Sequence, residues 1–186
     1  MEDTNARREG TSSFALAVDA LLCALLILSC LVTIPLGPVP FTLQTAVMVV
    51  IVLLRRPRDV ALITGAYLIM GAVGLPVFSG MSGGIVRAST GFLAAFFVGG
   101  VAASALRCAL VKAGGKTLVA DIVAAVVYLV IDFVLGWAWY VWFAGVTWAG
   151  AFAIMVAPFL LPDAIKAAAA ILVIREVRKR VPRAAD

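Results

Sequence analysis

Two opposite charges, Asp163 and Lys166, lie three residues apart within the last long apolar run of the chain. On a helix, residues i and i+3 share a face, so the carboxylate and the ammonium group can point at one ligand or at each other. A charge at the centre of a bilayer costs roughly 2.5–3.5 kcal/mol on insertion scales. A spanning helix that keeps two such charges is therefore expected to use them.

Two prolines, Pro158 and Pro162, stand just before this pair. Each proline removes a backbone donor, so the helix is expected to bend or break there and to leave carbonyl groups free. Broken helices at membrane depth are tolerated where they line a cavity. The sequence thus predicts a cavity beside Asp163.

The composition is that of a protein dissolved in lipid. The chain has 186 residues, of which 64% are hydrophobic and 13% are charged, whereas a soluble domain has about 45–50% apolar and about 25% charged residues. We expect an all-α integral membrane protein in which residues 1–186 form a single transmembrane domain, with no soluble module.

Six apolar runs are separated by loops rich in Gly, Pro or basic residues, and a spanning helix needs about 20 apolar residues. The six expected transmembrane helices are Phe14–Ile34, Phe41–Leu54, Val60–Val73, Thr90–Val111, Leu118–Tyr140 and Trp148–Val173. The second and third runs are short for a full span. A Gly- and Ser-rich loop is expected at 74–89, and polar ends at 1–13 and 175–186.

The basic residues predict the orientation, because almost all of them fall on one side of a six-helix path. They are Arg7, Arg8, Arg55, Arg56, Arg58, Arg107, Lys112, Lys116, Arg175, Arg178, Lys179, Arg180 and Arg183. Cytoplasmic loops of membrane proteins carry the excess of Lys and Arg. We therefore expect a multi-pass protein of the cell membrane with both termini in the cytoplasm, and the net charge of +5 needs no nucleic-acid partner to explain it.

Two carboxylates lie deep in the expected bundle. Counted along a helix from Arg175, Asp163 lies about 18 Å into the membrane, and counted from Lys116, Asp132 lies about 24 Å in. Both side chains are expected near the midplane or slightly outside it. Two interpretations stay open: Asp132 helps to form a ligand site open to the outside, or it only neutralises Lys166 in a buried ion pair.

The remaining acids and the first helix have separate interpretations. Asp19 and Asp121, near cytoplasmic helix ends, are interpreted as solvated residues or as first-turn residues that offset the helix dipole. On helix 1, Ala17, Ala20 and Ala24 form a face of small residues that lets another helix approach closely. Whether that partner helix belongs to this chain or to another protein stays open.

Several catalytic interpretations are excluded because the chain lacks residues that they require. The chain has no His, so Ser82 in the G-x-S-G run at 80–83 lacks the base that a serine protease needs, and the commonest metal ligand is absent. The G-K-T run at 115–117 lacks the first Gly of a phosphate-binding loop, so energy from ATP would have to come from a partner. An intramembrane aspartyl hydrolase using Asp132 and Asp163 remains the alternative from another class, as does a scaffold whose charges only join helices.

The run Val39-Pro40-Phe41-Thr42-Leu43-Gln44-Thr45 resembles the BioY family, the biotin-specific substrate-binding (S) components of energy-coupling-factor (ECF) transporters. The resemblance continues at 74–78, at Gly83-Gly84, and at Pro158-Phe159 followed by Asp163-x-x-Lys166. The chain departs from the family where G-P-T-x-G-Y usually precedes helix 4, because it has Ala88-Ser89-Thr90-Gly91-Phe92 there.

The resemblance implies a six-helix protein that captures biotin from outside and has no catalytic activity, no cofactor and no metal. It would work with a transmembrane coupling protein and two cytoplasmic ATPase subunits, and small residues on helix 1 (Ala17, Ala20, Ala24) would take part in docking. Another vitamin or a biotin precursor is the alternative ligand within this class.

The chemistry of biotin assigns hypothetical roles to these residues. A site for biotin must be mostly apolar, with a few polar groups that match its ureido ring and its carboxylate. Asp163 would accept from the ureido N–H groups, while Lys166 and Arg87 would donate to the ligand in roles that could be exchanged. Further candidates for the wall are Gln44, Thr45, Asp132, Gly83 and Thr90; Gln44 and Thr45 could equally anchor the start of helix 2.

Overall fold

The computed structural model describes residues 2–35 and 37–180, with side chains from residue 13 onward. Its helices are α1 (Glu2–Leu28), α2 (Gln44–Leu54), α3 (Pro57–Ala72), α4 (Thr90–Lys112), α5 (Thr117–Ala144), α6 (Trp148–Met155) and α7 (Ala157–Arg180). Two short strands, β1 (Thr33–Ile34) and β2 (Phe41–Thr42), lie between α1 and α2. The expected all-α class is therefore confirmed apart from this hairpin.

The β1–β2 hairpin corrects two predicted helix boundaries. Helix 1 was expected to run to Ile34 and helix 2 to begin at Phe41, but these residues pair with each other as antiparallel strands. Helix α1 ends at Leu28 and α2 begins at Gln44. The physical reason is the proline-rich connection at 35–40, because a proline lacks an N–H donor and disfavours helical backbone in the residue before it.

The predicted break in the last helix is confirmed. The expected helix Trp148–Val173 is two helices, α6 and α7, separated at Val156, which has φ −119° and ψ −55°. Pro158 lies in the first turn of α7, where a missing N–H costs little, and Pro162 lies inside the helix.

The predicted end of that last helix at Val173 is wrong, because α7 continues to Arg180. Glu176 forms ion pairs with Lys179 at 3.3 Å and with Arg180 at 3.0 Å, and such i,i+3 and i,i+4 pairs support the added turns. The expected polar end therefore begins as helix, while residues 181–186 lie outside the described part.

Three helices of the described chain, α4, α5 and α7, are long and apolar enough to cross a membrane. Residues 13–28 of α1 and the whole of α2 form shorter apolar helices. These helices are those of a multi-pass membrane protein, while the expected number of six spans stays a prediction.

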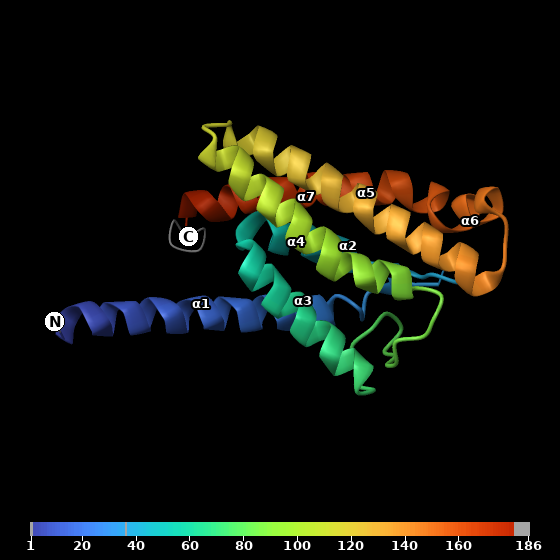
Figure 1. The fold of residues 1–186 in the computed structure, drawn as a ribbon, viewed down its shortest axis with the longest axis horizontal. Coiled ribbons are helices and arrows are strands. Elements are labelled where there is room, and N and C mark those ends of the chain that lie inside the picture. Colours follow the sequence, from blue (N-terminus) through green and yellow to red (C-terminus); the bar gives the residue numbers. More distant parts are fainter. Residues whose placement is uncertain (1, 36, 181–186) are drawn as a thin grey trace.

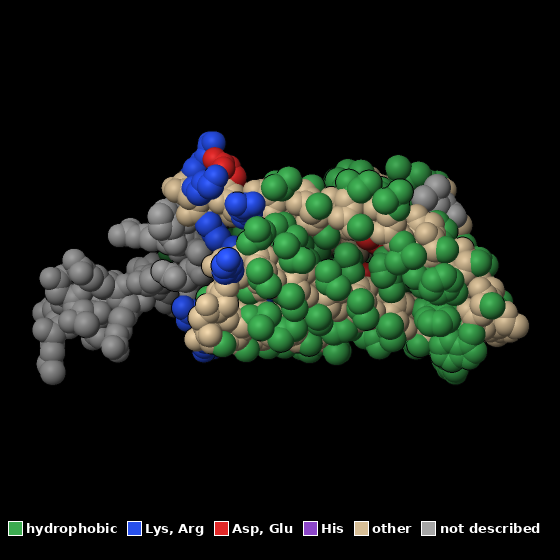
Figure 2. All heavy atoms as spheres, turned by 90° about the horizontal axis from the view of Figure 1, so that it is seen from above, with side chains coloured by type: hydrophobic (Ala, Val, Ile, Leu, Met, Phe, Trp, Pro, Cys, Tyr) green, Lys and Arg blue, Asp and Glu red, His purple; other side chains and the backbone are tan. Residues whose placement is uncertain are grey.

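The helices form an elongated bundle with chemically different ends. The turn between α4 and α5, the end of α7 and the start of α1 lie at one end, whereas the α3–α4 loop and the turn between α5 and α6 lie at the other (Figure 1). Lys and Arg side chains gather at the first end, and a broad hydrophobic belt covers the face beyond it (Figure 2). This end is called the basic end below. Arg7, Arg8 and Arg183 lie outside the side chains that the structure describes.

Helix α2 is the centre of the bundle. It packs against α1, α4, α5 and α7, and its residues Met48, Ile51, Val52 and Leu53 are fully buried. A helix that is hydrophobic all round belongs inside a bundle. Helix α2 is short because the β1–β2 hairpin, and not further helix, leads the chain into it from the end opposite the basic end.

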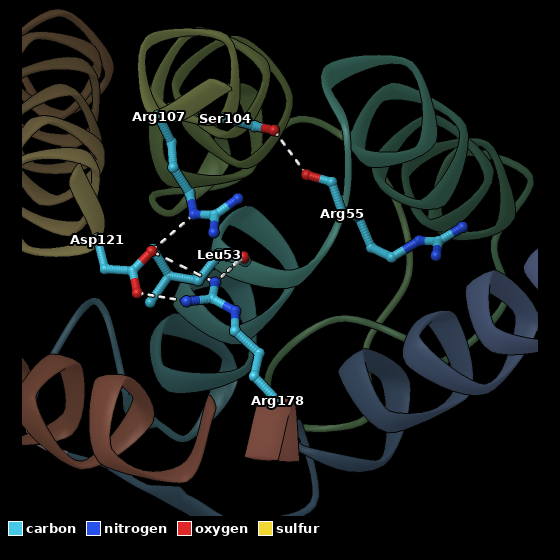
Figure 3. A network of polar contacts seen from close by, with 6 residues as sticks. All are labelled: Leu53, Arg55, Ser104, Arg107, Asp121 and Arg178. Carbon is cyan, nitrogen blue, oxygen red and sulfur yellow. Dashed lines mark hydrogen bonds and ion pairs between the residues drawn. The ribbon is translucent and has the colours of Figure 1, made fainter. Parts of the chain in front are cut away.

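A buried ion cluster joins four helices near the basic end, and Figure 3 shows it. The Asp121 carboxylate of α5 accepts from Arg107 of α4 at 2.6 Å and from Arg178 of α7 at 2.5 Å. Arg178 also donates to the carbonyl oxygen of Leu53 in α2. The interpretation of Asp121 as a solvated or first-turn residue is therefore wrong, since its side chain is inaccessible and its partners come from distant helices.

Asp19 needs the same correction. It is buried and pairs with Arg55 at 2.6 Å, which brings α1 to the turn between α2 and α3. The carbonyl of Arg55 accepts from the Ser104 hydroxyl of α4 at 2.7 Å, a bond drawn in Figure 3. The basic end is thus held together by buried charge pairs.

Candidate ligand-binding site

A cavity of about 50 Å³ lies in the half of the bundle away from the basic end. It is enclosed by the β1–β2 hairpin, the starts of α2, α4 and α7, the middle of α5 and the α3–α4 loop. Its lining residues are Val39, Pro40, Thr42, Gln44, Thr45, Ser79, Ser89, Phe92, Leu93, Phe96, Asp132, Phe133, Phe159, Asp163 and Lys166. The wall is mostly apolar with a few polar groups, which is the usual character of a small-molecule site.

Lys166 and Asp163 form an ion pair on the cavity wall. The Lys166 Nζ lies 2.5 Å from Asp163 Oδ1, and it also donates to the Thr42 carbonyl at 2.7 Å and to Thr45 Oγ1 at 2.8 Å. It lies 4.1 Å from the centre of the Phe41 ring, in cation–π geometry. These three oxygen partners use all three N–H donors of the ammonium group.

Only one carboxylate oxygen of Asp163, Oδ1, bonds to protein groups in the described part of the chain. Oδ1 accepts from Lys166 and from the Thr45 hydroxyl at 3.3 Å, and the side chain is 5% exposed. In the described part of the chain no protein donor bonds to Oδ2. The pair therefore presents a fixed, charge-compensated carboxylate whose second oxygen can accept a hydrogen bond from a ligand.

The helix break explains how this wall forms. Because α7 begins at Ala157, the side chains of Phe159, Asp163 and Lys166 follow one another at i, i+4 and i+7 on the face that lines the cavity. The β1–β2 hairpin brings Thr42 and Phe41 to the Lys166 ammonium group. The pairing thus joins residues more than a hundred positions apart in the chain.

Gln44 and Thr45 line the cavity at the start of α2. The Gln44 amide donates to the Tyr67 hydroxyl at 2.6 Å, and its backbone N–H donates to Thr42 Oγ1 at 3.3 Å. Both open interpretations of this residue, as helix-start anchor and as wall, are therefore compatible with its position.

Asp132 also lines the cavity, from the middle of α5. The interpretation of Asp132 as the counterion of Lys166 is wrong, because Lys166 pairs with Asp163. Asp132 is 1% exposed, and its Oδ1 is buried without a hydrogen-bond partner within residues 13–35 and 37–180.

Arg87, Gly83 and Thr90 lie beside the cavity rather than on its wall. The Arg87 guanidinium donates to the Ser82 hydroxyl and, at 3.4 Å, to the carbonyl of Ser79, which does line the cavity. The Thr90 hydroxyl accepts from the Arg87 backbone N–H at 3.0 Å. A Cβ on Gly83 would lie 2.6 Å from the Gly74 carbonyl oxygen, so this glycine permits close packing within the loop.

The resemblance pointed to three residues of this wall, since Ser89 and Phe92 lie in the segment that departs from the family pattern and Phe159 lies in a segment that matches it. The sequence analysis did not single out four other lining residues, which are Ser79, Leu93, Phe96 and Phe133. Apolar residues carry no distinguishing signal in a chain that is 64% hydrophobic. For Phe96, the usable signal was its i,i+4 spacing from Phe92 at the start of a predicted helix.

The small residues of α1 are exposed. Ala17, Ala20 and Ala24 lie on the surface of the described chain, and Ala20 and Ala24 contribute to an apolar groove between α1 and α3 together with Leu62 and Met70. Their predicted partner helix is therefore not supplied by the described residues.

Comparisons with known proteins agree on one family. The model of the BioY family matches residues 4–183. A protein of Pyrococcus horikoshii described as a probable biotin transporter BioY is 31% identical over 161 residues, covering 83% of this chain and 90% of that protein. The biotin transporter BioY2 of Lactococcus lactis is 32% identical over 162 residues, covering 86% of this chain and 87% of the relative.

A solved structure shows the same fold. The crystal structure described as the S-component for biotin from an ECF-type ABC transporter superposes with a TM-score of 0.84 at 22% sequence identity. The alignment covers 91% of this chain and 93% of the solved one. The overall arrangement of helices is thus the one seen in that solved structure.

Proposed function

This chain belongs to the BioY family, and from that premise we propose that it captures biotin at the outer face of the cell membrane as the S component of an ECF-type transporter. It is a transport protein and not an enzyme, so the alternative of an aspartyl hydrolase is set aside. Biotin is its transported ligand and not a cofactor. The observation that carries the proposal is the Asp163–Lys166 pair, which lies on the wall of a largely apolar cavity.

The polar groups of biotin match this wall. The ureido ring has two N–H donors and one carbonyl acceptor, and the free Oδ2 of Asp163 would accept from one of these N–H groups. Lys166 has no N–H left for the ligand while it bonds to Thr42, Thr45 and Asp163. Its role is therefore to keep Asp163 ionised and oriented, rather than to donate to biotin.

The rest of the ligand would contact apolar and loop residues. The side chains of Phe92, Phe96, Phe133 and Phe159 offer aromatic surface to the sulfur-containing ring and the aliphatic chain of biotin. The carboxylate of biotin would bind Arg87, whose guanidinium lies beside the wall and exchanges its serine contacts for a charged partner. Thr45 would orient the Asp163–Lys166 pair through its hydroxyl, and Gln44 bonds to the Tyr67 hydroxyl. Gly83 and Thr90 would keep the backbone before α4 in place.

Binding of radiolabelled biotin to the purified protein in detergent tests this proposal. We expect saturable binding by the wild type and its loss in Asp163→Asn, with Glu176→Gln as the matched control because Glu176 is an exposed acid on the same helix. Unchanged binding by folded Asp163→Asn would contradict the assigned role. Mass spectrometry of small molecules that co-purify would show whether another vitamin or a biotin precursor takes the site instead.

The proposed topology has six spans, with α6 and α7 together forming the last one and both termini in the cytoplasm. Support comes from the gathering of Lys and Arg at the end where α7 finishes (Figure 2), since cytoplasmic loops carry such residues. The cavity then lies in the outer half of the membrane, which suits capture from outside.

The proposed partners are those of an ECF transporter, a transmembrane coupling protein and two cytoplasmic ATPases. The exposed small residues Ala17, Ala20 and Ala24 support docking through α1, since small side chains let a second helix approach closely. The groove between α1 and α3 beside Ala20 and Ala24 provides the apolar surface for that contact.

A further inference from the structure

The Asp132 carboxyl group faces the cavity from the middle of α5 without a partner. Its Oδ1 is buried and has no hydrogen bond within the described residues, and a buried polar group that stays unpaired is unfavourable. Asp163 faces the same cavity from α7, so two carboxyl groups approach one ligand-binding space from different helices.

The two carboxyl groups differ in charge compensation. Asp163 has the Lys166 ammonium group at 2.5 Å, whereas no Lys or Arg nitrogen of the described chain forms an ion pair with Asp132. Lys166 cannot serve both, because its three donors already bond to Asp163, Thr42 and Thr45. An isolated carboxylate in an apolar interior takes up a proton rather than remain charged. In its protonated form Asp132 would offer one O–H donor and one C=O acceptor to the cavity.

A cyclic urea complements this pair of groups. One edge of the ureido ring carries an N–H beside the carbonyl oxygen, and a neutral carboxyl group can pair with that edge through two hydrogen bonds. Its O–H donates to the urea oxygen while its C=O accepts from the N–H. The other N–H then remains for the ionised Asp163. All donors and acceptors of the ureido ring are satisfied by this arrangement.

Building on the proposed function, we infer that Asp132 is a specificity-determining residue that reads the ureido carbonyl and one N–H of the ligand in its protonated form, opposite Asp163. Ligands that lack a cyclic urea leave the Asp132 carboxyl unpaired and are rejected. The site thereby selects a neutral urea over rings of similar shape.

Equilibrium binding of biotin to three variants tests this inference. Asp132→Leu removes both hydrogen bonds, and we expect biotin to bind roughly 10- to 100-fold more weakly. Asp132→Asn keeps a donor and an acceptor, and we expect its affinity to stay within about threefold of the wild type. Tyr128→Phe is the matched control, because the Tyr128 hydroxyl is also buried and unpartnered on α5 but does not line the cavity; its affinity should not change.

Two further measurements separate recognition from structural damage. Without ligand, Asp132→Leu should unfold at a temperature no lower than the wild type, because it replaces an unpaired buried polar group with an apolar one. With the thiourea analogue of biotin, whose sulfur is a poorer acceptor than oxygen, the same substitution should cause a smaller loss of affinity. Infrared difference spectra on biotin binding should show the carbonyl stretch of a protonated carboxyl, and this band should be missing in Asp132→Asn.

Three results would overturn the inference while the proposed function stands. They are binding of biotin by Asp132→Leu within about threefold of the wild type, an Asp132→Asn variant as weak as Asp132→Leu, and a wild-type spectrum without the protonated-carboxyl band. Failure of the wild type itself to bind biotin would instead reject the proposed function, and the inference with it.

Discussion

Substitution of Lys166 by Met should both destabilise the protein and abolish biotin binding. Both effects have the same cause, the loss of the positive charge that compensates the buried Asp163 carboxylate. Methionine keeps most of the apolar length of the side chain and removes the ammonium group. The Asp163 carboxylate, 5% exposed, loses its partner at 2.5 Å, and the Thr42 carbonyl and Thr45 hydroxyl each lose a charged donor. The variant therefore tests the contribution of the positive charge separately from that of side-chain packing.

The magnitude follows from the burial of the pair. Removing one partner of a buried ion pair costs about 3–5 kcal/mol, because the other charge stays buried without compensation. Each lost hydrogen bond to a charged group adds about 1.5–3 kcal/mol at most, but these terms overlap with the first and do not add fully. We therefore expect a loss of about 3–5 kcal/mol in the free energy of unfolding.

The double variant Lys166→Met, Asp163→Leu separates stability from function. Replacing both members of a buried ion pair with apolar residues is often neutral or stabilising, so the double variant should recover most of the stability that the single variant loses. It should still fail to bind biotin, because the Asp163 carboxylate, which the proposed function pairs with a ureido N–H, is absent.

The assay measures thermal unfolding and radiolabelled biotin binding on the same detergent preparations. Lys179→Met is the matched control, because Lys179 is 69% exposed on the same helix and should change neither quantity. The reasoning is refuted if Lys166→Met unfolds and binds like the wild type, or if the double variant remains as unstable as the single one.

Three further predictions concern the basic end, the docking face and the orientation. Asp121→Leu leaves two guanidinium groups without their shared carboxylate and should cost about 3–5 kcal/mol in the free energy of unfolding, measured by thermal unfolding in detergent, while the biotin affinity of the folded fraction stays unchanged. Ala20→Leu should reduce co-purification with the proposed coupling protein without changing biotin affinity, and equal co-purification would argue against docking through α1. In a cysteine-free background, a membrane-impermeant maleimide added to intact cells should label Val146→Cys and not Lys116→Cys; the reverse pattern would invert the proposed topology.

The sequence was sufficient for features that depend on neighbouring residues. Apolar runs gave the helices of the bundle, and the predicted Thr90–Val111 differs from α4 by one residue at its end. The prolines predicted the break before α7, and the i,i+3 spacing predicted that Asp163 and Lys166 share a face. Each of these follows from local backbone chemistry or helical periodicity.

Features that depend on distant partners could not be predicted in this way. The sequence predicts a solvated or first-turn role for Asp121, because its two arginine partners are on α4 and α7 and nothing in the sequence shows that they meet. The Thr42 carbonyl that binds Lys166 is a backbone group, and every residue has one. The hairpin boundaries were missed for a related reason, since only pairing of β1 with β2 distinguishes them from frayed helix ends.

The size of the cavity shows which part of the site must move for binding. A volume of about 50 Å³ accommodates about one or two water molecules, whereas sites for small molecules measure about 300–1,000 Å³. Some walls must therefore shift to admit biotin. The helical wall is held closely where α4 meets α5, since a Cβ on Gly91 would lie 2.3 Å from the Leu135 carbonyl oxygen.

The loop wall is joined to the bundle by side-chain packing of Val77 and Phe78 and by few backbone hydrogen bonds. The backbone hydrogen bonds of residues 74–84 in the described structure end within this loop or on the last turn of α3. Ser79, which lines the cavity, belongs to this segment. Enlargement of the cavity should therefore come from displacement of the α3–α4 loop, while Asp163 and Asp132 keep their positions on α7 and α5. Under the proposed function, recognition would rest on packed helices, which hold polar groups in fixed geometry, and entry of the ligand would depend on this loop segment, whose described backbone hydrogen bonds reach no helix beyond α3.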